Sequence, residues 1–256
     1  MKIHIFADMF GNVKDRAASR VFGFLKMLQH IPFVPQIIKL AYRVKDTPEV
    51  SCFGLKFRNP VGIAAGVDKN GEYYDILSNY GASFVEIGPM RDVLPAIRNL
   101  QENEPDTIVF ANLVNTDIER SFSLVYDFVD AIVLNVSNHS TVSTVIDRLV
   151  TLRRYSDEYR PILFKVAVDM GDEQLKEGIG YVLGSGLDGM MVPSSRVRQV
   201  VELSQGLFPV IAVGEFNNPV EVRQALDDGA RLVAVRDTFA HFHLSYVRRI
   251  LKYLSK

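Results

Sequence analysis

Eight short apolar runs recur along this chain at a fairly even spacing, and they constrain the fold more than any other feature of the sequence. They cover residues 61–64, 84–87, 108–111, 131–134, 162–166, 190–192, 210–213 and 232–235. Segments with helical spacing of apolar residues lie between them, at 142–155, 173–183, 196–204 and 220–227. Before the last of these, Asn218, Pro219 and Glu221 supply an N-cap, a first-turn proline and a capping-box acid. Strand and helix therefore alternate through most of the chain.

Continuous apolar runs are typical of parallel strands that are covered on both faces. Eight of them, each followed by a helix, predict an α/β fold, a (β/α)8 TIM barrel over residues 51–256. A doubly wound open sheet is the alternative. In a barrel the chemistry takes place at the carboxyl ends of the strands. Those ends carry Asp68, Lys69, Gly88, Asn112, Asn135, Lys165, Ser194, Gly214, Glu215, Arg236 and Asp237.

The first fifty residues differ in character and predict an N-terminal amphipathic helical extension over residues 1–50. Apolar residues within 17–28 and 37–41 mark two short helices, separated at 31–35. Their other side is basic, with Lys14, Arg16, Arg20, Lys26, Lys39, Arg43 and Lys45. A basic amphipathic pair of this kind can lie on an anionic membrane surface. A helical lid packed on the barrel is the other interpretation.

Composition excludes several classes of protein. The 256 residues are 48% hydrophobic and 23% charged, which is typical of a globular protein, and the net charge of −1 gives no general attraction to nucleic acid. Cys52 is the only cysteine and the five histidines form no HExxH pattern, so neither a disulfide framework nor a metal site is expected. No signal peptide or membrane span is recognisable. We expect a cytoplasmic protein, with peripheral attachment to the inner face of the membrane as a second option.

Residues 57–72, FRNPVGIAAGVDKNGE, join a buried strand to a turn of small residues and a charged loop. Together with FGLK before it and YGASFVEIG after it, this stretch resembles the dihydroorotate dehydrogenases, specifically their quinone-linked, membrane-associated class. The chain is similar to a shortened, divergent member. The resemblance implies an FMN-containing barrel that oxidises dihydroorotate to orotate in pyrimidine biosynthesis and passes the electrons to a membrane quinone.

The resemblance also implies roles for individual residues. Lys69 is expected to contact both the flavin and the substrate carboxylate, for which a compact ammonium is a suitable partner. Asn135, in LNVS, is expected to hold flavin and substrate, and Lys165, in FKVAVD, to lie at the pyrimidine edge of the flavin. The full set of expected cofactor contacts is Ala64, Ala65, Gly66, Lys69, Asn112, Asn135, Lys165, Ser194 and Gly214.

Several positions depart from the family pattern. Where the family has NISSPNT, residues 135–141 read NVSNHST, so Asn138 replaces the catalytic-base serine. A carboxamide cannot act as a general base, and losing a positioned base typically costs about 10²- to 10⁴-fold in rate. The neighbouring His139 is chemically a better base than serine, and a surface-loop histidine is the alternative interpretation. The family's NRxGFNN run, which clasps the substrate, is absent.

The expected phosphate site differs most. Glu215 and Asp237 stand where the family has glycine-rich turns that bind the flavin phosphate. At about 4 Å and an effective dielectric near 20, each carboxylate would repel a unit charge on the phosphate by roughly 4 kcal/mol. Arg236 would offset part of this repulsion.

Three hypotheses follow. The protein is a dihydroorotate dehydrogenase, or a diverged paralogue without FMN or dehydrogenase activity that serves a binding or regulatory role, or a Schiff-base aldolase or lyase that uses Lys165. The expected partners are a small carboxylate substrate, a quinone and a membrane surface, without nucleic acid, and a homo-oligomer stays open.

Overall fold

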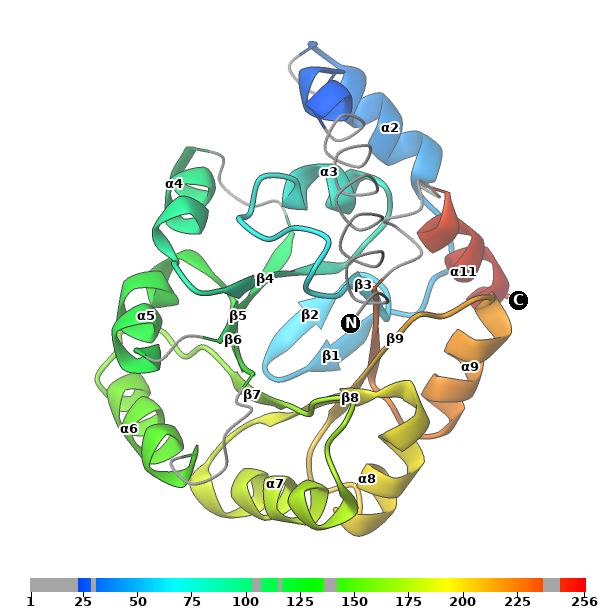
Figure 1. The fold of residues 1–256 in the computed structure, drawn as a ribbon. Helices are drawn as coiled ribbons and strands as arrows, with labels where there is room; N and C mark the ends of the chain where they lie inside the picture. Colours follow the sequence, from blue (N-terminus) through cyan, green and yellow to red (C-terminus); the bar gives the residue numbers. More distant parts are fainter. Residues whose placement is uncertain (1–22, 29–30, 103–106, 115–116, 136–141, 237–244) are drawn as a thin grey trace, which may run out of the picture.

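Eight parallel strands close into a barrel in the order β10-β3-β4-β5-β6-β7-β8-β9 (Figure 1). The computed structural model describes residues 23–28, 31–102, 107–114, 117–135, 142–236 and 245–256. The barrel strands are β3 (Val61–Ile63), β4 (Phe84–Met90), β5 (Ile108–Leu113), β6 (Ala131–Leu134), β7 (Ile162–Lys165), β8 (Gly189–Pro193), β9 (Val210–Gly214) and β10 (Leu232–Val235). The predicted (β/α)8 barrel is confirmed. The doubly wound alternative is wrong, because β10 pairs with both β9 and β3 and leaves no open edge.

Helices surround the barrel between successive strands (Figure 1). They are α3 (Tyr74–Asn79), α4 (Leu94–Glu102), α5 (Ile118–Val125), α6 (Val142–Arg154), α7 (Asp172–Ser185), α8 (Val197–Leu203), α9 (Pro219–Asp227) and α11 (Tyr246–Leu254), with short 3-10 helices η1 (Tyr126–Phe128) and η3 (Ser194–Arg196). The predicted cap of α9 is present, since Asn218 Oδ1 accepts hydrogen bonds from the N–H groups of Val220 and Glu221. Each helix packs its apolar face on the outer side of the strands.

A small hairpin lies across one end of the barrel and has no counterpart in the sequence-based prediction. Its strands β1 (Val50–Cys52) and β2 (Leu55–Phe57) pair antiparallel, with Phe53 and Gly54 as the two-residue turn. Both turn residues have positive φ, 56° and 78°, as a type I′ turn requires. Phe57, the last residue of β2, packs edge-on against Phe84 and Phe110. The hairpin therefore seals the end of the barrel where the strands begin.

Alternation along the strands sorts the barrel interior into layers. Phe84 and Phe110 stack on each other at 4.9 Å in the lower layer, beside Leu163. Two residues further along the same strands come Glu86, Asn112 and Lys165, which therefore form the next inward layer. The interior is thus apolar where the strands begin and polar where they end.

The helix α2 (Val34–Tyr42) precedes the hairpin and lies outside the ring of barrel helices, beside α3 (Figure 1). Tyr42, at its end, packs edge-on against Tyr80 at 4.5 Å. No residue of α2 is buried, and Phe33, Ile37 and Leu40 are 74%, 63% and 73% exposed. The division into an extension and a barrel at residue 50 stays a prediction.

Candidate active site

A buried carboxylate, Glu86 of β4, is the centre of the polar layer at the carboxyl ends of the strands. It accepts hydrogen bonds from Lys165 Nζ at 2.6 and 2.8 Å and from Asn112 Nδ2 at 2.5 Å. Its second oxygen also accepts the backbone N–H of Ala65 at 2.8 Å. Glu86 and Asn112 are fully buried and the Lys165 side chain is 13% exposed, so the Glu86–Lys165 ion pair is largely shielded from water. The structure thus brings Asn112 and Lys165 together around an acid that the sequence reasoning missed.

Asn135 and Lys69 extend this layer into a cavity of about 600 Å³. Asn135 Nδ2 lies 3.5 Å from Asn112 Oδ1 and links the buried layer to the cavity wall. Lys69 is exposed and makes no hydrogen bond or ion pair with any described residue. The other lining residues are Asn70, Pro89, Met90, Arg91, Asp92, Pro95 and Val114. An ammonium and an amide therefore face the same space, which suits a small polar anion.

Asp68 fixes the loop that carries Lys69. Its carboxylate is fully buried and accepts the backbone N–H groups of Glu72 at 2.9 Å and Tyr73 at 2.8 Å. Its backbone oxygen accepts the N–H of Gly88 at 2.9 Å, which ties the loop to β4. Burial raises the pKa of the Asp68 carboxyl to about 6, although the backbone hydrogen bonds lower it in part. Asp68 therefore has a structural role. It holds the loop in place, and Lys69 extends outward from that loop.

The small residues Ala64, Ala65 and Gly66 form a platform beside the Glu86 cluster. Their N–H groups donate to Val235 O, to Glu86 and to Gly88 O, so the backbone here is held from inside the barrel. Ala64 and Ala65 are buried, whereas Gly66 has φ of +107° and nothing within 4 Å of the place where a Cβ would stand. The platform thus offers an open approach to a flat ligand at Gly66.

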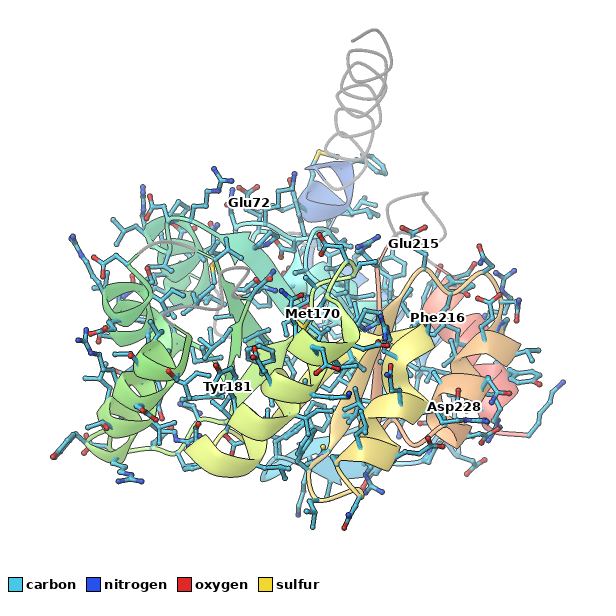
Figure 2. The ribbon with its side chains drawn as sticks, turned by 60° about the horizontal axis from the view of Figure 1, so that its bottom comes forward. Glu72, Met170, Tyr181, Glu215, Phe216 and Asp228 are labelled. Atoms are coloured by element: carbon cyan, nitrogen blue, oxygen red, sulfur yellow. The ribbon has the colours of Figure 1, made fainter. Side chains whose placement is uncertain are left out.

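The ends of β9 and β10 form the opposite corner of the barrel mouth. Glu215 follows β9 and its carboxylate accepts a hydrogen bond from Arg236 Nη2 at 2.7 Å. Figure 2 shows Glu215 and Glu72 at the same upper edge of the molecule and Asp228 at the lower edge. Ser194 is beside Gly214, since a Cβ at Gly214 would stand 3.0 Å from Ser194 Oγ. Ser194 and Gly214 are therefore neighbours at this corner, as their strand positions indicate.

Three predicted site residues, Asn138, His139 and Asp237, lie outside the described residues. Their roles stay predictions. The missed residue Glu86 has a signal in the sequence, because it is the single charged residue within the apolar run 84–87. Such a charge in a strand buried on both faces requires a partner.

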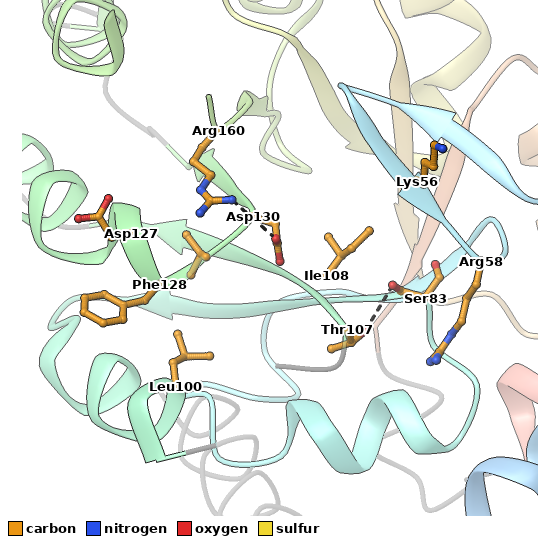
Figure 3. Close-up of a pocket in the computed structure, with 11 residues that line it drawn as sticks. Lys56, Arg58, Ser83, Leu100, Thr107, Ile108, Asp127, Phe128, Asp130 and Arg160 are labelled. Atoms are coloured by element: carbon orange, nitrogen blue, oxygen red, sulfur yellow. Dashed lines mark hydrogen bonds and ion pairs between the residues drawn. The ribbon is translucent and has the colours of Figure 1, made fainter. Parts of the chain in front are cut away.

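A second cavity of about 610 Å³ lies at the amino ends of the strands (Figure 3). It is lined by residues that precede or begin β4, β5, β6 and β7, including Ser83, Thr107, Asp130 and Arg160. Arg160 Nη1 lies 3.9 Å from Asp130 Oδ1. Thr107 Oγ1 donates a hydrogen bond to the backbone oxygen of Ser83. Because barrel enzymes use the carboxyl ends of their strands, we assign function to the Lys69 cavity.

The described residues contain no group of three or more histidine, cysteine, aspartate or glutamate side chains placed to hold a metal ion. No helix within the described ranges has the length and apolar character needed to cross a membrane.

The sequence is similar to known proteins along most of its length. The sequence is 25% identical to a dihydroorotate dehydrogenase (quinone) of Christiangramia forsetii, over 86% of this chain and 88% of that protein. It is 22% identical to the enzyme of the same name from Proteus mirabilis, over 94% of this chain and 96% of the relative. A third relative of that name, from Photobacterium profundum, is 25% identical over 84% of this chain and 89% of the relative. No family model matches the sequence.

Solved structures agree on the fold. The ligand-free dihydroorotate dehydrogenase of Eimeria tenella superposes with a TM-score of 0.78, with 17% identity and coverage of 93% of both chains. A mandelate oxidase variant with an FMN adduct gives a TM-score of 0.56, with 15% identity over 82% of this chain and 76% of the oxidase. The fold is therefore the (β/α)8 barrel that these two solved structures also have.

Proposed function

We propose that this protein is a flavin-dependent oxidoreductase of the dihydroorotate dehydrogenase type, which takes a small carboxylate-bearing substrate at the carboxyl end of its barrel. The observation that carries the proposal is Lys69, an ammonium that pairs with no described residue and faces a cavity of about 600 Å³ together with Asn135. The buried Lys165 is already paired with Glu86, so Lys69 is the lysine at this mouth that is available to a ligand anion.

The residues of the first corner fit the ring system of a flavin. Ala64 and Ala65 are small and buried, and the space over Gly66 is open, so a flat heterocycle can approach the backbone there. Lys165 and Asn112 lie beside that platform and would face the polar edge of the ring. A bound flavin would supply the acceptor for the hydride that the substrate loses.

The phosphate end of FMN fits less well. Arg236, the cation at that corner, is already engaged by the carboxylate of Glu215 at 2.7 Å. A phosphate group would have to share this arginine with a like-charged side chain. The chain's own residues therefore support binding of the flavin ring more than binding of its phosphate.

The substrate's contacts can be assigned from the cavity. Lys69 would bind the carboxylate and Asn135 would donate to a ring carbonyl, which fixes the orientation of a dihydropyrimidine ring. The substrate proton must be taken by a base, and the expected position is held by Asn138, a carboxamide, beside His139. His139 is therefore the proposed proton acceptor.

The test is flavin content and substrate binding. Purified protein should be yellow, and dihydroorotate should reduce a dye in its presence. Lys69→Ala should weaken orotate binding, measured by calorimetry, by about 10- to 150-fold, the value of a hydrogen bond between charged groups. Lys56→Ala is the matched control, because Lys56 is an exposed lysine at the other end of the barrel. A colourless protein that binds no flavin would refute the proposal.

The second candidate is a diverged paralogue without dehydrogenase activity, and the Glu215–Arg236 pair favours it. This candidate predicts that orotate still binds and that its binding still depends on Lys69, whereas dihydroorotate reduces no dye.

A third hypothesis, the Schiff-base aldolase, requires Lys165 with a free electron pair. The bidentate contact of Lys165 with Glu86 counts against it, because a paired ammonium is not a nucleophile.

The exposed face of α2 supports peripheral membrane association, where a quinone is accessible. Ile37, Leu40 and the N-cap residue Phe33 are exposed here together with Lys39 and the C-cap residue Arg43, and the combination suits the inner, anionic face of a membrane. The protein should float with vesicles that contain anionic lipid, and Ile37→Glu/Leu40→Glu should abolish flotation. Leu207→Glu, at an equally exposed leucine on the loop after α8, is the control. Equal flotation of both variants would contradict the proposal.

A further inference from the structure

The corner formed by the ends of β9 and β10 is where barrels of this type commonly bind phosphate groups. The loops after the seventh and eighth strands usually present backbone N–H groups, and a helix N-terminus adds a favourable dipole. In this chain β9 ends at Gly214 and β10 at Val235, so Glu215 and Arg236 occupy those two loop positions. The helix that follows β9 is α9, whose N-terminus begins at Pro219.

Four backbone N–H groups among the described residues of this corner are already satisfied by the chain itself. Arg236 N–H donates to Gly214 O at 3.0 Å, and Asn217 N–H donates to Glu221 Oε2 at 2.8 Å. The N–H groups of Val220 and Glu221, in the first turn of α9, have no acceptor within the helix and donate to Asn218 Oδ1. An incoming phosphate would have to displace these hydrogen bonds, two of which belong to a cap that stabilises the helix.

The side-chain charges at the corner also oppose a phosphate. Glu215 holds Arg236 in an ion pair at 2.7 Å, and Glu221 brings a second carboxylate to the start of α9. Just behind them, buried Phe216 is fixed by a hydrogen bond from Tyr246 Oη to its backbone oxygen. The backbone that carries Glu215 is therefore anchored, and its carboxylate stays near the mouth.

We propose that Glu215 is a specificity residue that excludes a terminal phosphate, so that this barrel prefers a flavin that ends in an uncharged ribityl chain, with riboflavin as the test ligand, over FMN. The inference rests on the proposed function in one respect, that the ligand is a flavin. A carboxylate within a few ångströms of a dianion repels it, and the half-exposed position of Glu215 weakens but does not remove this effect. We expect at least a tenfold preference for riboflavin.

The experiment is a titration of the purified 256-residue chain with riboflavin and with FMN, monitored by the quenching of flavin fluorescence. The wild-type protein should bind riboflavin at least about tenfold more tightly. Glu215→Gln should raise FMN affinity at least about fivefold and leave riboflavin affinity unchanged, because it removes a negative charge from beside Arg236. Adding Arg236→Gln should remove that gain. Glu177→Gln, which alters an exposed acid on α7, should change neither affinity.

The outcomes separate the inference from the proposed function. Tighter binding of FMN than of riboflavin to the wild-type protein would overturn the inference and leave the proposed flavin function standing. A riboflavin preference that Glu215→Gln does not alter would also overturn it, because the selectivity would then come from other residues. Failure of the wild-type protein and of Glu215→Gln to bind either flavin would refute the proposed function and the inference with it.

Discussion

The buried pair between Glu86 and Lys165 gives the sharpest test of how this barrel is held together. Glutamine at position 86 keeps the shape of the side chain but leaves the Lys165 ammonium without its counter-charge, at a site where the lysine is only 13% exposed. Removing one partner of a buried ion pair costs about 3–5 kcal/mol. In a protein of this size, about 2–4 °C of melting temperature corresponds to each kcal/mol, so Glu86→Gln should melt about 6–20 °C lower.

A double-mutant cycle isolates the pair from the rest of the site. Lys165→Met should also destabilise the protein, because it leaves the Glu86 carboxylate with only Asn112 and the Ala65 N–H as donors. The double variant Glu86→Gln/Lys165→Met contains neither charge and should recover at least about 1.5 kcal/mol relative to the sum of the single losses, as measured by urea unfolding. The control Lys69→Met should stay within about 0.5 kcal/mol of the wild type. A loss below about 1 kcal/mol for Glu86→Gln, or additive losses in the double variant, would refute the reasoning.

Three further predictions concern single residues. The Asp68 carboxyl has a pKa of about 6 in the folded state and 3.8 as the ordinary value, so it stays protonated to higher pH when folded. The free energy of unfolding of the wild type relative to Asp68→Asn should therefore fall by up to about 3 kcal/mol as pH rises from about 4 to 7. A difference that does not change with pH in urea unfolding would contradict this. Gly88→Ala should lower the free energy of unfolding by more than about 2 kcal/mol, because φ is +116° and a Cβ would stand 2.8 Å from Asn112 O. At Gly180 on α7 a Cβ would meet no atom within 4 Å, so Gly180→Ala should stabilise the protein by about 0.5–1 kcal/mol in thermal melts. Asn218→Ala should cost about 1 kcal/mol of unfolding free energy, with loss of hydrogen-exchange protection confined to the first turn of α9.

The barrel could be predicted from the sequence because its strands have one physical requirement in common. A parallel strand with helices on one side and the barrel interior on the other is buried on both faces, so it must be apolar without interruption. For this reason seven of the eight barrel strands begin at the first residue of their predicted run, and β8 begins one residue earlier than its run. The hairpin β1–β2 escaped prediction, because strands of three residues are too short to show alternation and Phe53–Gly54 is not a common turn pair.

The candidate site could be predicted in part. Asn112, Asn135 and Lys165 stand at strand ends, and the closure of the barrel brings them together. Glu86 could not be assigned to Lys165 in the same way, because 79 residues separate them and nothing in their local sequence relates them. The pairing depends on the shear and order of the strands, which the apolar pattern alone does not specify.

The layered interior nevertheless supplies a rule that would have found Glu86. Two residues beyond each inward aromatic or aliphatic side chain comes the next inward position, which gives Glu86 after Phe84 and Lys165 after Leu163. The apolar layer below excludes water, so a lysine in the layer above must find its counter-charge among the other strands in the same layer. Once Glu86 neutralises Lys165, the charge that a ligand meets must come from a side chain outside that layer. Lys69 satisfies this condition, because it stands on a loop held by Asp68 and not on a strand.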